Sequence, residues 1–383
     1  MANGSTAGRV YRANPGYRLL GLAELSPDER SALGDAGNDA SVHGVLTPRE
    51  GAHLTVKLVN EDTARLFRSL ARGATVPGEP ESQTLQLQLR DLVAAEILEL
   101  EDRGTFRTGL DALPLLDEQR TEPDAGGALD RLSRDAIAYA EGLRLDNPAA
   151  IADRIYAYHR IAVGPSSRRR WSAEAVQAGI RAALRGAAGG ERWRELGHPS
   201  TWASYGRVDA GPDADSLAPL HKLYVSPMPE ELSDALVVTL DAIADRDGVV
   251  GWKVGSDCYG ILRPDKLMVY MESAEVLSAL GEELRSRLDG MPWHGVPFTA
   301  ELGAEGLLSW GVDPPRFSTA NAGLLPESWR TWLAGRLAGT LWQAARDGVE
   351  DALDLALLRL RAAGVDTDTW TPSHTLFAAA EGG

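Results

Sequence analysis

The sequence predicts an α+β fold with an N-terminal winged-helix-like module, central helices, and a C-terminal ferredoxin-like βαββαβ sheet with flanking helices. Three observations predict it. Strands and helices lead to a hairpin tip early in the chain, apolar residues follow helical spacing in the middle, and alternating strands and amphipathic helices follow. We expect a disordered start, the module, a linker, the helical region and an α+β domain, with boundaries at 1–8, 9–116, 117–128, 129–200 and 201–375.

The N-terminal module has the order of elements that is typical of a winged helix. Strands are predicted at 16–22 and 53–59, and a helix follows at 62–73 with Asp62 as its N-cap. Residues 85–101 should form a helix running into a strand, and GTFRTG (104–109) reads as the tip of a hairpin. The candidate recognition helix, LQLQLRDLVAAEI (85–97), has one arginine and is otherwise mostly apolar or acidic, which disfavours DNA binding.

The C-terminal half gives the clearest prediction of architecture. Helices that end at glycines separate the predicted strands, and the resulting order is β-α-β-β-α-β. The strands are expected at 221–227, 249–256, 266–273 and 295–303. Two further helices, within 327–348 and 349–364, should pack against this sheet.

Composition excludes several classes of function. The 383-residue chain has a formal net charge of −16, which disfavours binding to nucleic acid. It has neither a long apolar run nor a signal-like start, so we expect a cytoplasmic protein without membrane contact. Cys258 is the single cysteine and the seven histidines show no ligand spacing, so no metal is expected. No Walker loop and no GxGxxG after a strand is present, and we expect no cofactor.

Lysine is scarce, and its positions suggest a site. Only four of the 39 Lys and Arg residues are lysines, at positions 57, 222, 253 and 266, and the last three lie in one stretch of 45 residues. Side chains two apart on a strand share a face. The three C-terminal lysines can therefore converge with Tyr224 and Tyr270 on one face of the sheet. The alternative is an ordinary solvent-exposed face.

Two segments, GWKVGSDCYGILRPDKLMVYMES and HGVPFTAELGAEGLLSWGVDPP, resemble the HopA-type effector-like proteins. This family includes type III secretion effectors and bacterial proteins encoded with lanthipeptide-like and thioamitide-like peptides. The resemblance covers roughly residues 130–370, and it implies that 201–375 is a HopA-like catalytic domain. It also implies a phosphoserine/phosphothreonine lyase: a kinase-like partner phosphorylates a precursor peptide, and the lyase eliminates the phosphate.

The N-terminal module also resembles, through VKLVNEDTARLFRSL and LRDLVAAEILELEDRGTFRTG, the leader-peptide recognition modules of ribosomal-peptide biosynthesis. In such modules the leader adds as a strand beside the sheet. A structural domain that binds no ligand is the alternative.

Elimination of phosphate requires a base for the Cα proton, cations for the phosphate and an acid for the leaving group. A lysine becomes a base only when burial or neighbouring cations lower its pKa. Lys253 is the first candidate for the base and Lys222 the second. Arg263 and Lys266 are candidates to hold the phosphate.

Three further residues complete the predicted site. Tyr224 or His294 would supply the acid, although a histidine beside Trp and Pro is more often a packed loop residue. Asp313 is expected to form a turn before two prolines, or else to position a lysine or arginine of the site.

Two other functions remain open. The protein could be a non-catalytic subunit that binds the peptide and delivers it to a separate enzyme, in which case its cations need not converge. It could also eliminate glutamate from glutamylated hydroxyls, and this less charged substrate would tolerate loss of a cation better.

Overall fold

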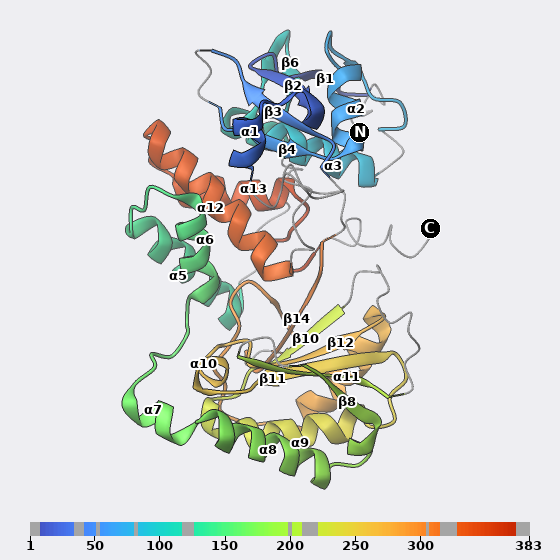
Figure 1. Cartoon of the computed structure of the whole chain (residues 1–383), viewed down its shortest axis with the longest axis vertical. Helices are drawn as coiled ribbons and strands as arrows, with labels where there is room; N and C mark the ends of the chain where they lie inside the picture. The colour runs from blue at the N-terminus through green and yellow to red at the C-terminus, as the bar shows by residue number, and fades with distance from the viewer. Residues whose placement is uncertain are drawn as a thin grey trace, which may run out of the picture.

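The computed structural model describes residues 8–33, 42–50, 54–79, 83–116, 126–197, 201–208, 221–303, 306–314 and 328–372. The protein mixes helix and sheet, which confirms the α+β class. Three layers follow one another along the long axis: the N-terminal module, a group of helices, and a sheet whose outer face is covered by helices (Figure 1). The expected disordered start and the linker lie largely outside the described residues.

The N-terminal module contains two small antiparallel sheets and two main helices. One sheet has the order β5 (Ala74–Thr75), β1 (Val10–Ala13), β6 (Leu98–Asp102), β7 (Thr105–Arg107), and the other has the order β2 (Tyr17–Gly21), β3 (Gly44–Pro48), β4 (Lys57–Val59). The helices are α2 (Glu61–Ser69) and α3 (Gln83–Ala94), with shorter helices at α1 (Pro27–Ala32) and α4 (Leu113–Leu116). The winged-helix interpretation stays a prediction.

The start of α2 corrects one expectation. Its N-cap is Asn60 rather than Asp62, because the Asn60 side chain accepts a hydrogen bond from the Thr63 backbone N–H at 2.9 Å. An N-cap residue must accept from the second or third residue of the helix, and Asn60 does so. Asp62 lies inside the first turn, where its charge favours the positive end of the helix dipole.

The middle layer is built from helices that are far apart in the sequence. They are α5 (Ala128–Gly142), α6 (Pro148–Ala157), α12 (Trp329–Asp347) and α13 (Ala352–Ala362), which share one apolar core. Trp329 and Trp332 of α12 are fully buried in that core, with their rings stacked 5.6 Å apart. Burial of such large rings is the main force that fixes α12 in place.

The predicted helical region continues through α7 (Pro165–Arg170) and α8 (Ala173–Gly186), but its end is wrong. Residues Trp193–Gly197 form strand β8, which pairs with β9 (Trp202–Arg207). The Trp193 ring is buried and lies edge-on to Trp252, 6.4 Å away, while Arg194 is exposed. The buried Trp193 ring anchors the segment as an edge strand of the C-terminal sheet.

The C-terminal sheet has seven described strands, where four were expected. Its order is β13 (Ala300–Glu301), β14 (Leu308–Val312), β10 (His221–Val225), β12 (Leu267–Met271), β11 (Val249–Gly255), β9, β8. The strands expected at 221–227, 249–256 and 266–273 are confirmed as β10, β11 and β12.

The fourth expected strand, 295–303, is wrong for most of its length. Phe298 has a φ of +64°, which is incompatible with a strand. Its backbone N–H donates to the Ser133 hydroxyl of α5 at 2.7 Å, and the Thr299 hydroxyl donates to the Val296 carbonyl at 2.6 Å. The chain therefore turns here against the middle layer, and β14 takes the place beside β10.

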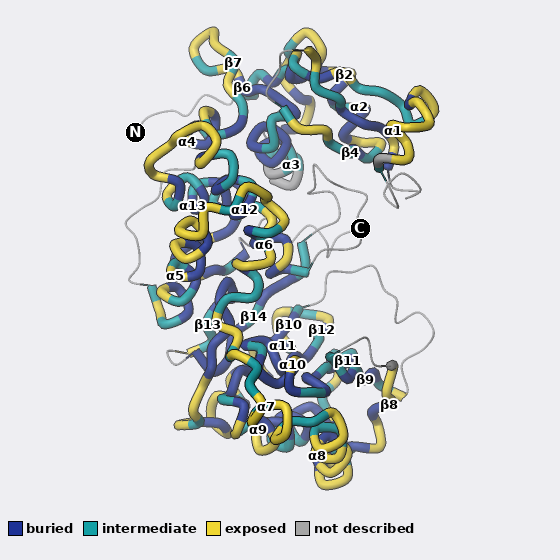
Figure 2. Tube along the Cα trace, turned by 60° about the vertical axis from the view of Figure 1, so that its left-hand side comes forward, coloured by how far each residue is buried: buried dark blue, intermediate teal, exposed yellow. Residues whose placement is uncertain are grey.

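The two faces of the sheet have different surroundings. Leu223, Trp252 and Val269 point into an apolar core shared with α8, α9 (Leu232–Ile243) and α11 (Ala274–Arg287), as the predicted alternation requires. The opposite face carries the lysines and turns toward the middle layer. Figure 2 shows that the strands are largely buried between these two sets of helices. No described helix combines the length and the apolar character needed to cross a membrane.

Candidate functional site

Cross-strand pairing places the predicted side chains on one face of the sheet. Lys222 lies opposite Tyr270, and Met268 lies between Tyr224 and Lys253 on its two neighbouring strands. Directly opposed residues share a face, so these five side chains form one surface, which we call the cation face. Lys222 Nζ and Lys253 Nζ lie 5.6 and 5.7 Å from the centre of the Tyr270 ring.

Lys253 has an unusual environment for a charged side chain. Its Nζ lies 4.7 Å from the centre of the Trp202 ring, and it has no hydrogen bond or ion pair with any described residue. Burial lowers its pKa to about 8, and the positive charges of Lys222 and Arg263 act in the same direction. About one-tenth of the amine is therefore neutral at pH 7. A lysine with such a lowered pKa can accept a proton near neutral pH.

Lys222 is paired, in contrast to Lys253. Its Nζ donates to Asp313 Oδ1 at 2.5 Å, and the same oxygen accepts from the Trp329 backbone N–H at 3.1 Å. Asp313 therefore connects the sheet to the start of α12. The sequence left open whether Asp313 forms a turn or positions a cation, and the structure shows the contact with a cation.

Arg263 lies at the entrance to β12 and is held by a buried carboxylate. Its Nε and Nη2 donate to the two oxygens of Asp265, both at 2.8 Å, and Nη2 also donates to the Tyr156 hydroxyl at 2.9 Å. The guanidinium stacks on Trp202, 4.9 Å from the ring centre. Its Nη1 has no partner among the described atoms, so two N–H groups of Arg263 are free to bind a ligand.

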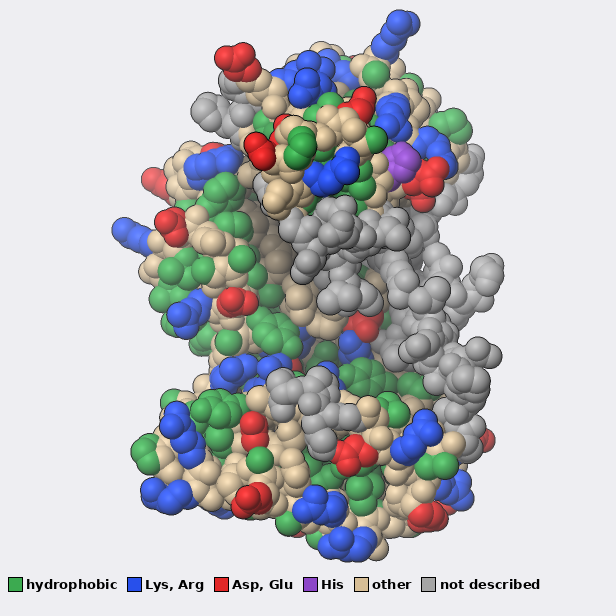
Figure 3. All heavy atoms as spheres, in the orientation of Figure 1, with side chains coloured by type: hydrophobic (Ala, Val, Ile, Leu, Met, Phe, Trp, Pro, Cys, Tyr) green, Lys and Arg blue, Asp and Glu red, His purple; other side chains and the backbone are tan. Residues whose placement is uncertain are grey.

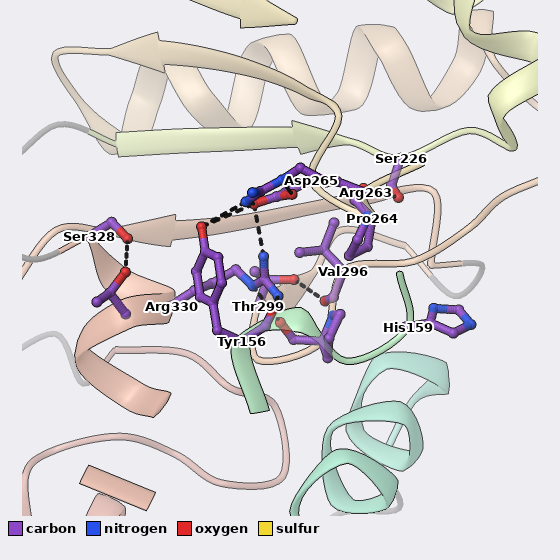
Figure 4. Close-up of polar contacts among 12 residues, drawn as sticks. Tyr156, His159, Ser226, Arg263, Pro264, Asp265, Val296, Thr299, Ser328 and Arg330 are labelled. Atoms are coloured by element: carbon purple, nitrogen blue, oxygen red, sulfur yellow. Dashed lines mark hydrogen bonds and ion pairs between the residues drawn. The ribbon is translucent and has the colours of Figure 1, made fainter. Parts of the chain in front are cut away.

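Arg330 of α12 completes this network, and sequence reasoning missed it. It is 2% exposed and donates to Asp265 at 2.9 Å, to the Pro297 carbonyl at 3.1 Å and to the Tyr156 carbonyl at 2.9 Å. Figure 4 shows Tyr156, Arg263 and Arg330 around Asp265. Burial alone would raise the pKa of Asp265, but Arg330 and then Arg263 hold it well below its ordinary value. The missed signal is a lone arginine on the apolar face of α12.

Lys266 and His294 form a separate buried pair. Lys266 is 0% exposed and donates to the Pro227 carbonyl at 2.8 Å, and its Nζ lies 2.9 Å from His294 Nδ1. His294 Nε2 lies 2.6 Å from the His159 carbonyl, which can only accept, so Nε2 carries the ring proton. Burial and the Lys266 charge lower the pKa of His294 to about 3, and burial lowers that of Lys266 to about 7.

This geometry does not support the roles predicted for the pair. The one proton of His294 is used on a backbone carbonyl, so the ring is not available as an acid. Lys266 has no exposed surface with which to contact a phosphate. Together they fasten the start of β12 to the loop before Val296, which is a structural role.

Arg160 adds an exposed cation that the sequence did not single out. It follows α6, and its guanidinium has no partner in the described part of the chain. Burial and the neighbouring charge of Arg263 lower its pKa, which places it beside the network. Figure 3 shows Lys and Arg side chains along the hollow between the middle layer and the sheet. Among the described residues, no three His, Cys, Asp or Glu side chains form a possible metal site.

No family model matches the chain, and no curated protein matches it. Solved structures do match. An effector protein from Pseudomonas syringae pv. tomato is 16% identical, with 64% of this chain and 97% of that chain covered and a TM-score of 0.43. The phosphothreonine lyase SpvC from Salmonella is 13% identical (48% and 90% covered, TM-score 0.28). The phosphothreonine lyase OspF from Shigella flexneri is 10% identical (46% and 88% covered, TM-score 0.28).

Proposed function

We propose that this protein eliminates phosphate from phosphoserine or phosphothreonine of a ribosomally synthesised precursor peptide and leaves a dehydroamino acid. One observation carries the proposal. Lys253 is a partly buried amine with a pKa of about 8 and no hydrogen-bond or ion-pair partner among the described residues, on a face whose other charged groups are mostly paired. A base and an anion-binding surface in one place are what β-elimination of phosphate requires.

The reaction assigns one task to each group. The neutral amine of Lys253 takes the Cα proton, and the electron pair of the Cα–H bond becomes the Cα=Cβ double bond. The Cβ–O bond breaks, and its electron pair leaves with the phosphate. The step is redox-neutral, because one electron pair forms the double bond and the other leaves with the phosphate.

Arg263 and Arg160 are proposed to hold the phosphate. The Arg263 guanidinium lies over the same aromatic ring, Trp202, as Lys253, and Arg160 lies beside Arg263 at the exposed edge. Charge-assisted hydrogen bonds from guanidinium groups to phosphate oxygens are among the strongest in proteins. These contacts stabilise the charge that develops on the leaving group.

Tyr224 is the better of the two predicted donors to the leaving oxygen. It lies on the cation face, across Met268 from Lys253, and its hydroxyl has no described partner. Burial raises its pKa well above its ordinary value of 10, so it keeps its proton at any working pH. It would therefore donate a hydrogen bond to the departing phosphate without giving up its proton.

Phosphorylation of the peptide is assigned to a separate kinase-like protein. The N-terminal module would bind the leader, since its two sheets end in strands β5, β7, β2 and β4 to which an extended peptide can add. Both assignments follow from the resemblance of the sequence to proteins of peptide biosynthesis.

The test is mass spectrometry of a synthetic phosphothreonine peptide after incubation with the protein, without metal or nucleotide. The wild type is expected to remove one phosphoric acid from the peptide. Lys253→Ala and Lys253→Arg should slow this by about 10²- to 10⁴-fold, the usual contribution of a general base. The arginine variant keeps the positive charge but cannot act as a base, so it should still bind the phosphopeptide.

Arg65→Ala is the matched control, because Arg65 is an exposed arginine on α2 far from the cation face. It should react like the wild type. Peptide binding without any loss of mass would contradict the lyase and favour the delivery subunit. Loss of glutamate from a glutamyl-threonine peptide, with no reaction of the phosphopeptide, would favour the third function.

A further inference from the structure

A cavity of about 540 Å³ lies at the junction of the N-terminal module and the middle layer, away from the cation face. Its walls come from β4, the end of α3, the start of α6, and helices α12 and α13. Pockets that hold small molecules have volumes of about 300–1,000 Å³, and they often form where separate units meet. Both the size and the position therefore fit a ligand site.

The described residues that line the cavity carry more positive than negative charge. The basic ones are Lys57, Arg336, Arg346 and Arg359, and the acidic ones are Asp91 and Glu96. Asp91 accepts from Arg336 at 3.1 Å and from Arg359 at 2.8 Å, which joins α3 to α12 and α13. A local excess of cations in a chain with a net charge of −16 favours an anion at this place.

Two buried donors on the wall lack an acceptor. Arg359 is 8% exposed, and its Nη1 makes no hydrogen bond to any described atom. Trp332 is 1% exposed, and its Nε1 also makes no hydrogen bond to any described atom. Buried donors are almost always satisfied, because leaving one unpaired costs the full penalty of removing it from water. Lys57 Nζ has one weak contact, 3.4 Å from the Thr55 hydroxyl, so a third donor is nearly free.

Two glycines in the middle of α12 keep the cavity open. Gly335 and Gly339 lie one turn apart and both line it. A Cβ added at either position would meet no described atom within 4 Å, so close packing does not require glycine there. Glycine weakens a helix interior, and its use at two such positions indicates that the space beside them is needed.

We propose that this cavity binds a small organic anion through a carboxylate or phosphate group. Arg359 Nη1, Trp332 Nε1 and Lys57 Nζ donate to the anion, and the helix wall at Gly335 and Gly339 accommodates the rest of the ligand. A small molecule fits the volume better than a folded partner. The site is independent of the lyase, since none of its residues belongs to the cation face.

The test is isothermal titration calorimetry of the full chain with inorganic phosphate and with succinate at low ionic strength. Binding to the wild type is expected, and Gly339→Leu should abolish it by filling the cavity without changing any charge. Lys57→Met should weaken it about tenfold or more, as expected for loss of a charged donor. Gly186→Leu is the matched control, because Gly186 is a helical glycine of α8 that also has nothing within 4 Å.

A Lys253→Met protein should bind as the wild type does, which separates this cavity from the proposed lyase site. The proposal is overturned if neither anion binds, or if Gly339→Leu binds as well as Gly186→Leu. It is also overturned if only an acidic peptide binds, or if a crystal structure shows a segment of the chain itself filling the cavity.

Discussion

Replacing Lys253 with methionine should make the protein more stable at neutral pH while it removes the proposed base. Methionine keeps most of the length and apolar surface of the lysine stem. What it removes is an amine whose protonated form is disfavoured in the fold, because burial is the largest cause of its low pKa. A gain in stability when a side chain is replaced is expected where that side chain serves a reaction and destabilises the fold.

The magnitude follows from the pKa. Folding lowers it from 10.5 to about 8, and each tenfold change in proton affinity corresponds to about 1.36 kcal/mol, so the charged lysine costs about 3 kcal/mol. The contacts of Nζ with the Trp202 and Tyr270 rings offset about 0.5–1 kcal/mol each. The free energy of unfolding should therefore rise by about 1–2 kcal/mol in Lys253→Met at pH 7.

The pH dependence is the sharper part of this prediction. Because the folded pKa lies below the unfolded one, the cost is complete below about pH 8 and is relieved as the pH rises toward 10.5. Near pH 10 it should be less than about 1 kcal/mol. Urea unfolding at pH 7 and pH 10 measures both values, with Arg65→Met as the control that should change little. A destabilised variant, or a gain in stability that is independent of pH, would show that the Lys253 amine is not destabilised by burial.

Two other results are expected. The kcat/KM for the phosphothreonine peptide should rise with pH through about 8, because the neutral amine of Lys253 is the active form in the proposed reaction. Lys222→Met should move the midpoint of this profile upward, because it removes a neighbouring cation. A kcat/KM that falls with pH would contradict the assignment of Lys253 as the base. Arg330→Met should lower the free energy of unfolding, measured in urea, by about 3–5 kcal/mol, because it breaks a fully buried ion pair with Asp265. Combining Arg330→Met with Asp265→Asn should recover part of this loss. A change below about 1 kcal/mol would show that the ion pair does not stabilise the fold.

Period-two alternation was enough to place the lysines. Leu223 and Trp252 had to face an apolar core, and this alone turned Lys222 and Lys253 to the opposite side of the sheet. The scarcity of lysine then marked that side as unusual. Alternation does not reveal strand order, however, so the sequence could not show that Lys222 and Lys253 both approach Tyr270 across the sheet.

The remaining errors come from contacts between residues that are distant in the sequence. The sequence around Phe298 predicts a strand, but the fold makes it a loop whose Phe298 backbone N–H donates to Ser133, on a helix 165 residues earlier. Arg330 looks like an ordinary helix residue until α12 is packed against Asp265, 65 positions away. The sequence offers His294 both as a candidate acid and as a packed loop residue, and only the folded chain shows that its two ring nitrogens contact Lys266 and a backbone carbonyl. Local patterns contain no information on such pairs.

The distribution of charge at the cation face explains why an anionic group should bind there. Lys222 is balanced by Asp313, and Asp265 balances only one of the two arginines that contact it, Arg263 and Arg330. Together with Lys253, whose charge has no described partner, these groups at and beside the cation face lack about two negative charges when Lys253 is protonated, and the exposed Arg160 adds a further positive charge at the edge. A phosphorylated threonine carries about −1.5 to −2 charges and would supply them. Binding would then raise the pKa of Lys253, so the proposed reaction requires that amine to lie away from the phosphate and close to Cα, and its contact with Trp202 is one means of doing so.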